Sequence, residues 1–356
     1  MSMQIDSTAG RSITYAEALQ EAVESEMGRD PSVIVFGLGV DDPVKIYGTT
    51  AGLQERFGED RVFDTPLAED SMTGVAIGAA FAGLRPIHVH IRMDFLMLAM
   101  NQLVNIAAKA SYMYGGQLSV PIVIRAVIGR SWGQGPQHSQ ALHSLFMHVP
   151  GLHVVAPATP YDAKGTMISA IRDNNPVLMM EHRLLYSNAG VVPEEPYEVP
   201  FGKARRLLDG TDVTLIGVSH MSVECVRAAG FLRDAGIYAE VIDLLSLSPL
   251  DIDTILNSVS KTGRLLVVDN AWLQCGASAE VIARVAESLP RGSDVHMQRM
   301  GFAPVPAPTT RILEDEFYPN AQTISLKAYE MVRGASDGWV PPDGEAGEVT
   351  AFRGPF

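Results

Sequence analysis

Residues 61–83, RVFDTPLAEDSMTGVAIGAAFAG, decide the fold of this chain. A short β-prone run opens the stretch, and a long helix rich in glycine and alanine follows. Thr65 is predicted to cap this helix with Pro66 at its first position, which would place Glu69 in the first turn. A carboxylate just beyond the end of a strand lies where open α/β sheets bind ligands. The alternative is that Glu69 and Asp70 only complement the helix dipole, worth about 0.3–1 kcal/mol each.

Strands and helices are predicted to alternate on both sides of this stretch. A helix over residues 12–29 and a strand over residues 32–39 precede it. Buried strands follow at residues 86–91, 120–129, 153–158 and 176–182, and the longest helix between them runs from residue 95 to about 112. Alternation with short links predicts a parallel sheet with helices on both faces.

The chain is predicted to contain two such domains, because 356 residues exceed the usual limit of about 250–300 residues for one core. Residues 1–190 form the first domain, and residues 191–205, rich in proline and glutamate, form an extended linker. A smaller α/β domain covers residues 206–333, and residues 334–356 form an irregular tail. The predicted fold class is α/β with two open, mostly parallel sheets.

Composition excludes several classes of function. The net charge of −14 disfavours nucleic acid and anionic membranes as partners. No run of about 18 apolar residues could cross a membrane, and the N-terminus has no apolar core of a signal peptide. Cys225 and Cys275 have no metal-ligand spacing, which indicates a reducing compartment. We therefore expect a cytoplasmic protein.

His138 is a second candidate for chemistry. It follows the flexible loop SWGQGPQ after a predicted strand. An imidazole at such a place can meet a substrate and titrate near neutrality. The alternative is a loop histidine that caps a helix. His143 and His148 recur at a spacing of five, which turns each residue to a different side of a helix, so a metal cluster is not expected.

Seven motifs then identify a family. They are TPLAE at 65–69, NQLVN with AAK at 101–109, YM at 112–113, QHSQ at 137–140, PGL at 150–152, DAKG at 162–165 and RDNNP at 172–176. With these motifs in this order, the chain resembles the beta subunit of the decarboxylating component of 2-oxo acid dehydrogenases, a family that includes pyruvate, acetoin and branched-chain enzymes. The likeness covers roughly residues 12–330 and includes SPLD at 248–251 and ILED at 312–315.

This resemblance implies a transketolase-like pyrimidine-binding domain and a transketolase C-terminal-like domain. It also implies thiamine diphosphate, shared with an alpha subunit in an α2β2 heterotetramer, and Mg2+ held by that alpha subunit. The sequence agrees by omission, because thiamine enzymes hold the diphosphate through Mg2+ on a Gly-Asp-Gly segment. The Asp-Gly dipeptides here, at 209–210, 337–338 and 343–344, lie in other contexts.

The resemblance assigns roles to four residues of the first domain. Glu69 would bind ring nitrogen N1′ of the cofactor and favour its imino tautomer. His138 would lie beside the reaction centre and bind or protonate the substrate. Phe95 would pack on the aminopyrimidine ring, although ordinary core packing remains the alternative, and Leu67 would also contact the cofactor.

A potassium site is also implied by the resemblance. Main-chain carbonyls would surround the ion, and such cages suit a large, weakly hydrated cation. A Schellman-like helix end with asparagine in the left-handed conformation is the alternative. The carbonyls are those of Ile122, Ala170, Ile171, Asp173 and Asn175.

The expected function is decarboxylation of a 2-oxo acid with transfer of the acyl group to a lipoyl carrier, which would make a lipoyl acyltransferase a further partner. His88, His90 and Arg92 depart from the family pattern. They share one face of a strand, which either meets the alpha subunit, the favoured interpretation, or lines a pocket for a polar or anionic substrate. These residues motivate the alternative of a split transketolase-like or acyloin-forming enzyme. A non-catalytic α/β scaffold subunit is the other alternative.

Overall fold

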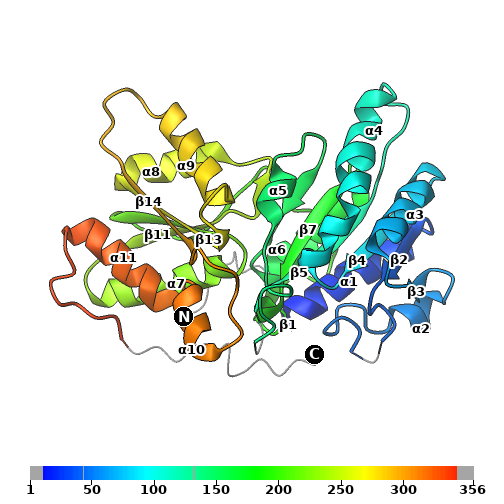
Figure 1. Cartoon of the computed structure of the whole chain (residues 1–356), viewed down its shortest axis with the longest axis horizontal. Helices are drawn as coiled ribbons and strands as arrows, with labels where there is room; N and C mark the ends of the chain where they lie inside the picture. The colour runs from blue at the N-terminus through cyan, green and yellow to red at the C-terminus, as the bar shows by residue number, and fades with distance from the viewer. Residues whose placement is uncertain (1–10, 43, 131–132, 343–356) are drawn as a thin grey trace. The chain divides into compact units, whose positions relative to one another are not determined.

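The computed structural model describes residues 11–42, 44–130 and 133–342 (Figure 1). Within them the chain forms two compact units. Residues 11–129 and 140–201 belong to the first unit, and residues 130–139 and 202–342 belong to the second unit. The predicted α/β fold class is confirmed. The predicted domain limits of 1–190, 191–205, 206–333 and 334–356 stay a prediction.

The first unit is built on a parallel sheet in which its strands run in the order β6-β7-β5-β4-β2-β3. Helix α1 packs against α6, and α3 packs against η1 and η2. A short antiparallel pair, β1 with β8, lies outside this sheet. The bounds are β1 Arg11–Thr14, α1 Tyr15–Arg29, β2 Val33–Gly37, α2 Leu53–Phe57, β3 Val62–Asp64, α3 Glu69–Phe81, β4 Arg85–His90, η1 Met93–Ala99, η2 Gln102–Ala107, α4 Ala108–Met113, β5 Val123–Ile128, α5 His143–Met147, β6 His153–Val155, α6 Pro160–Arg172, β7 Val177–His182, η3 Arg183–Leu185 and β8 Ala189–Val192.

One local prediction for this unit is wrong. Thr65 does not cap α3, because its backbone N–H donates to Gly37 O at 3.0 Å and so continues the extended chain. The helix has Ala68 as its N-cap, three residues later than predicted, and Ala68 makes no side-chain hydrogen bond.

The helix predicted over residues 95–112 is confirmed, since residues 93–113 are helical throughout. Its hydrogen-bond pattern changes along its length, from the 3-10 helix η1 to the π-helix η2 and the α-helix α4.

The core of the first unit contains a charged network. Arg125, on the central strand β5, donates to Glu181 at 2.6 and 2.8 Å and to Thr49 at 2.8 Å. Tyr186 donates to the same carboxylate at 2.8 Å. Because Arg125 and Glu181 are fully buried, removing either partner would leave an uncompensated charge in the core.

The second unit has a five-stranded sheet in the order β14-β13-β10-β11-β9, with β9 antiparallel and the other pairs parallel. Helices α7 and α11 cover one face, and α8 and α9 lie on the other (Figure 1). The bounds are β9 Arg205–Leu208, β10 Val213–Gly217, α7 His220–Asp234, β11 Ala239–Asp243, β12 Ser246–Ser248, α8 Ile252–Thr262, β13 Arg264–Trp272, α9 Ala277–Ser288, β14 His296–Phe302, α10 Arg311–Phe317 and α11 Ala321–Arg333. Among the described residues, no helix is long and apolar enough to cross a membrane.

Candidate active site

Glu69 is the first residue of α3, and its side chain is 8% exposed. It borders a small pocket at the carboxyl ends of β2, β3 and β4, where parallel sheets bind ligands. In this chain alone the pocket has a cavity volume of about 0 Å3, whereas a complete small-molecule site has roughly 300–1,000 Å3. The Glu69 pocket is lined by Leu38, Thr65, Pro66, Ala68, Glu69, Met72, His88, Val89 and His90.

A glycine allows the wall of this pocket to form. Gly37 ends β2 at a φ of +150°, and a Cβ built there would lie 2.3 Å from Val89 O. The next residue, Leu38, donates its N–H to that carbonyl at 3.2 Å. The backbones of β2 and β4 can therefore approach beside the pocket only because residue 37 has no side chain.

His88 and His90 line the Glu69 pocket from β4, and each is 2% exposed. His88 Nδ1 lies 3.2 Å from Phe36 O, and its ring packs on the Phe36 ring at a centroid distance of 4.9 Å. Burial lowers the pKa of His88 to about 4. His90 Nε2 lies 3.3 Å from Thr73 Oγ1 on α3. Burial first, and then the neighbouring His88, lower the pKa of His90 well below 6.5.

Arg92, the third polar residue of this face, is also buried, at 8% exposed. Its guanidinium donates to the adjacent Ile91 O at 2.8 Å. Burial first, and then the proximity of Arg92, lower the pKa of Arg183 to about 10. Arg92 does not line the Glu69 pocket. The sequence grouped His88, His90 and Arg92 by strand alternation, but only the two histidines line this pocket.

His138 belongs to the second unit, where α10 holds the loop that precedes it. Gly133 donates its N–H to the carboxyl of Glu314. A Cβ on Gly133 would lie 2.4 Å from Thr309 O, so this loop is in close backbone contact with the segment just before α10. Burial raises the pKa of Glu314, and the nearby Arg130 opposes this rise. His138 itself is half-buried and donates its N–H to Gly135 O at 3.3 Å.

Leu67 and Phe95 differ in exposure. Leu67 lies in the bend before α3 and is 78% exposed, so it does not line the Glu69 pocket. Phe95 is half-buried in η1, three residues after Arg92, whose carbonyl accepts its N–H at 3.3 Å.

The carbonyls at the end of α6 bind a cation from the chain itself. Arg85 donates to Ile171 O at 2.8 Å and to Arg172 O and Asp173 O at 2.7 Å each. Asp173 ends the helix at φ −68° and ψ 148°, so the alternative of a left-handed, Schellman-like end is wrong. Sequence reasoning missed Arg85, because it lies 86 residues before Ile171 in the chain.

The other two carbonyls predicted to bind potassium, together with Asn175, are also placed by the structure. Ile122 O accepts the N–H of Val177 at 2.9 Å, and Ala170 is buried in the last turns of α6. Asn175 donates its backbone and side-chain N–H groups to Asp173 Oδ1 at 2.7 and 2.8 Å. Among the described residues, no group of three or more His, Cys, Asp or Glu side chains could hold a metal ion.

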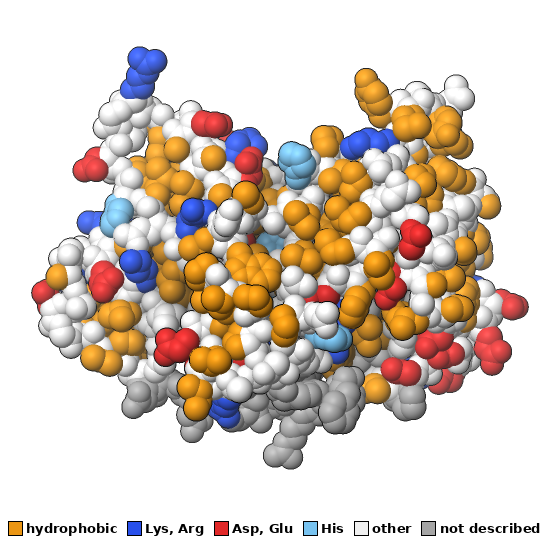
Figure 2. Space-filling model, viewed as in Figure 1, with side chains coloured by type: hydrophobic (Ala, Val, Ile, Leu, Met, Phe, Trp, Pro, Cys, Tyr) orange, Lys and Arg blue, Asp and Glu red, His pale blue; other side chains and the backbone are white. Residues whose placement is uncertain are grey.

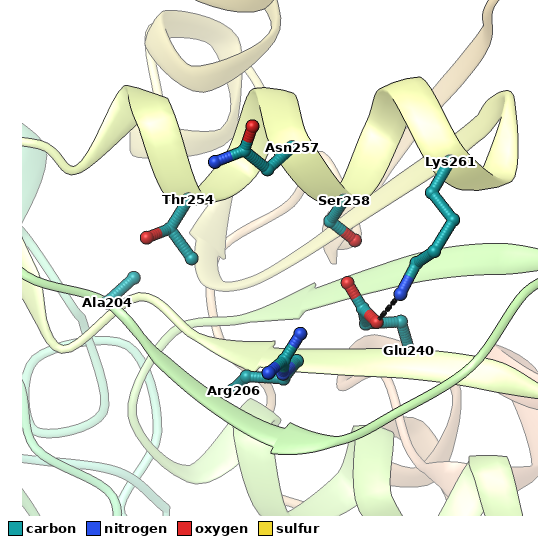
Figure 3. Close-up of a pocket in the computed structure, with 7 residues that line it drawn as sticks. All are labelled: Ala204, Arg206, Glu240, Thr254, Asn257, Ser258 and Lys261. Atoms are coloured by element: carbon teal, nitrogen blue, oxygen red, sulfur yellow. Dashed lines mark hydrogen bonds and ion pairs between the residues drawn. The ribbon is translucent and has the colours of Figure 1, made fainter.

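The second unit contains a larger pocket, the Glu240 pocket, with a volume of about 450 Å3. Lys261 and Glu240 point toward each other and form an ion pair (Figure 3). Ser258 Oγ lies 2.7 Å from Thr214 Oγ1. Burial raises the pKa of Glu240, but hydrogen bonds from Lys261 and Ser258 outweigh burial and hold it below the usual value. The lining residues are Ala204, Arg206, Glu240, Thr254, Asn257, Ser258 and Lys261.

Two family profiles match this chain. Residues 11–188 match the transketolase pyrimidine binding domain, and residues 202–324 match the transketolase C-terminal domain. The Glu69 pocket lies within the first match and the Glu240 pocket within the second.

Curated relatives match over most of their length. The chain is 42% identical over 334 residues to the acetoin:2,6-dichlorophenolindophenol oxidoreductase subunit beta of Cupriavidus necator, covering 91% of this chain and 98% of the relative. It is 40% identical over 321 residues to the mitochondrial pyruvate dehydrogenase E1 component subunit beta of Bos taurus, covering 89% of each. A solved split gene transketolase, an inactive beta4 tetramer, shares the fold with a TM-score of 0.74 at 22% identity, covering 91% of this chain and 99% of that chain.

Proposed function

The chain belongs to the family of beta subunits of 2-oxo acid dehydrogenase decarboxylating components, as its motifs predict, and we propose that it works with an alpha subunit as a thiamine diphosphate enzyme. The complex decarboxylates a 2-oxo acid and passes the acyl group to a lipoyl carrier. One observation carries the proposal: a nearly buried carboxylate, Glu69, faces a small pocket at the strand ends without a hydrogen-bond partner among the described residues.

Glu69 fits the nitrogen edge of an aminopyrimidine ring. Its carboxylate accepts hydrogen bonds and has none from the described chain. Pro66, Met72 and Val89 add apolar side chains to the lining beside this carboxylate. Thiamine diphosphate, when bound, supplies the carbanion chemistry of decarboxylation. The role of Glu69 is to hold a proton at ring nitrogen N1′ and so favour the imino tautomer.

The size of the pocket supports a site shared with another chain. Because this chain alone forms no cavity that could enclose a cofactor, the cofactor is enclosed with the help of the alpha subunit, which also holds Mg2+ in this proposal. Exposed apolar side chains support the same partner, since large apolar patches mark protein interfaces. Figure 2 shows such side chains over α4, where Tyr112 is 92% and Met113 63% exposed. Leu67 and Phe95 are proposed to contact the cofactor in this complex.

His138 is proposed as the residue that binds or protonates the substrate. Its half-buried position on a loop allows contact with a ligand, and the bonds from the loop to α10 limit its movement. A His138→Ala variant of the complex should therefore turn over 2-oxo acids more slowly than wild type, which steady-state kinetics would measure.

Potassium remains part of the proposal, together with Arg85. A carbonyl oxygen has two lone pairs, so Ile171 O and Asp173 O can accept from Arg85 and still bind an ion. The ion would be held by carbonyls of Ile122, Ala170, Ile171, Asp173 and Asn175. Potassium should then raise the unfolding temperature more than sodium at equal ionic strength.

The test is a Glu69→Gln variant, purified as the complex with the alpha subunit. Because glutamine cannot exchange a proton with the ring, turnover of 2-oxo acids should fall by about 10²–10⁴-fold. Asp70→Asn is the control, since Asp70 is exposed on the same turn of α3 and should leave turnover within about 2-fold. Full activity of Glu69→Gln would reject the proposal. Acceleration by a lipoyl-domain protein would establish the lipoyl carrier and its acyltransferase as partners.

A further inference from the structure

The motif ILED at residues 312–315 has no part in the function proposed above, although the sequence singled it out. It lies on α10. Three of its side chains are exposed, whereas Glu314 is 4% exposed. A glutamate is rarely so buried unless it is paired. The contacts of Glu314 therefore indicate what this part of α10 does.

Glu314 binds the backbone of the loop that carries His138. One oxygen of its carboxyl accepts the N–H of Gly133, the first residue of the His138 loop, residues 133–138. The other oxygen, Oε1, is buried and has no hydrogen-bond partner among the described residues. An unpaired buried oxygen costs folding free energy. Stability alone therefore does not account for a carboxylate at residue 314, whereas the bond to the loop does.

The segment before α10 contacts the His138 loop at a second place. Gly133 and Gly135 have φ values of +77° and +71°. A Cβ on Gly133 would lie 2.4 Å from Thr309 O, and one on Gly135 would lie 2.6 Å from Thr309 Cγ2. His138 donates its N–H to Gly135 O at 3.3 Å. Contacts therefore connect Glu314 and Thr309 to the backbone of His138.

Arg130 binds the chain to α10 just before the loop. Its guanidinium lies 4.8 Å from the centroid of the Tyr318 ring, and its Nη1 atom lies 3.9 Å from Asp315 Oδ1. Tyr318 packs on Phe302 and Phe317 in an aromatic cluster of the second unit. Because α10 ends in this cluster, it gives the His138 loop a fixed support.

The role proposed for His138 depends on such a support. A group that exchanges a proton with a substrate must lie within hydrogen-bond reach of it. A misplacement of 1 Å can cost about 100-fold in rate. Glycine loses more conformational freedom than other residues when it is ordered, so a loop with Gly133 and Gly135 needs outside contacts to hold one position.

We propose that Glu314 is a positioning residue for His138, acting through its hydrogen bond to Gly133. This inference rests on the proposed function, because it takes His138 to bind or protonate the substrate. It assigns the ILED motif of the second unit to catalysis, although Glu314 itself contacts neither substrate nor cofactor.

The experiment compares two variants in the complex with the alpha subunit, using steady-state turnover of 2-oxo acids. Glu314→Met removes the acceptor for Gly133, and this loss of one hydrogen bond should lower kcat/KM about 10-fold. Glu314→Gln keeps an amide oxygen as acceptor and should stay within about 3-fold of wild type. Kd for thiamine diphosphate with Mg2+, measured by calorimetry, should be the same in both variants as in wild type. Equal kcat/KM values for the two variants would overturn the inference.

A double variant shows whether Glu314 acts through His138. In a His138→Ala complex the loop carries no imidazole to position, so adding Glu314→Met should lower turnover by less than about 2-fold. A full further loss, equal to that caused by Glu314→Met in wild type, would show that Glu314 acts by another route and would reject the inference.

Controls separate positioning from destabilisation. Glu316→Met changes an exposed glutamate of the same helix and should leave turnover unchanged. Glu314→Met should not lower the unfolding temperature, since it removes an unpaired buried oxygen. Gly133→Ala gives an independent result if Glu314→Met does not fold. It keeps the carboxylate but crowds Thr309 O, so turnover should fall, and unchanged turnover would contradict the inference.

The outcomes also distinguish the two proposals. A wild-type complex that binds no thiamine diphosphate would reject the proposed function itself, and a His138→Ala complex as active as wild type would remove the role of His138. A slow His138→Ala complex beside a Glu314→Met complex of wild-type activity would keep the proposed function and reject this inference.

Discussion

The Glu69 pocket and the Glu240 pocket lie in two α/β units of similar construction. They differ in whether the polar groups that line them bond one another. In the second unit, Lys261 pairs with Glu240 (Figure 3), and Ser258 pairs with Thr214. In the first unit, Glu69, His88 and His90 line a smaller pocket and do not bond one another.

This difference separates a structural pocket from a binding site. Polar groups that satisfy each other need no ligand, so the larger volume of the Glu240 pocket does not indicate function. Polar groups that are buried and unpaired raise the free energy of the folded chain unless a ligand pairs with them. In this protein, whether the lining polar groups pair with one another therefore indicates a binding site better than pocket volume does.

The largest expected effect tests the buried imidazole of His88 through pH. Its pKa is about 4 in the folded chain and about 6.5 when unfolded, so the unfolded chain binds more protons between these values. Stability from this group is complete above pH 6.5 and is lost as pH falls to about 4. Denaturant unfolding at pH 7 and pH 4 should show wild type losing about 3 kcal/mol more than His88→Phe.

His153→Phe, the same substitution at a half-buried histidine at the start of β6, is measured alongside as the comparison. A His88→Phe variant with the same acid loss as wild type would show that His88 is not neutral in the folded chain.

Two glycines at strand ends, one in each unit, test whether crowding beside the Glu69 pocket affects cofactor binding as well as stability. Gly37 ends β2 and Gly217 ends β10, and a Cβ on either would lie 2.3 Å from backbone atoms. Alanine at either position should cost about 2–3 kcal/mol of unfolding free energy. Only Gly37→Ala should also weaken thiamine diphosphate binding by the complex, and equal effects of both on binding would remove the distinction.

Lys261→Met tests whether the Glu240 pocket, whose polar groups pair with one another, has only a structural role. Glu240 would remain buried and lose its cationic partner, although Ser258 still bonds it, so unfolding free energy should fall by about 1–2 kcal/mol. Catalysis and cofactor affinity of the complex should stay unchanged. Arg206→Met is the control, since its pair with Asp209 is exposed and should contribute less than about 0.5 kcal/mol. A loss of cofactor affinity in Lys261→Met would make the Glu240 pocket functional.

The smallest effect concerns two glycines of the second unit that have free space around them. Gly230 lies inside α7, whereas Gly263 ends α8 at a φ of +66°. Gly230→Ala should stabilise the chain by about 0.5–1 kcal/mol, and Gly263→Ala should destabilise it by about 1 kcal/mol. Denaturant unfolding measures both, and cofactor binding should respond to neither because the second unit lacks the Glu69 pocket.

Much of this protein was determined by local sequence. The alternation of apolar strands with helices predicts the α/β fold, because each element buries one face against the other. The position of Glu69 at the start of a helix and the seven ordered motifs predict the family, which the relatives confirm. These features depend on residues close together in the chain.

Tertiary structure decided the rest, because it depends on which distant residues meet. Thr65 had the chemistry of a helix cap, but pairing with Gly37 keeps it extended. Arg85 meets the carbonyls at the end of α6, some 86 residues later, and no local pattern announces that contact. The neutral state of His88 comes from burial among strands and a helix, since the same imidazole in solution would titrate near pH 6.5.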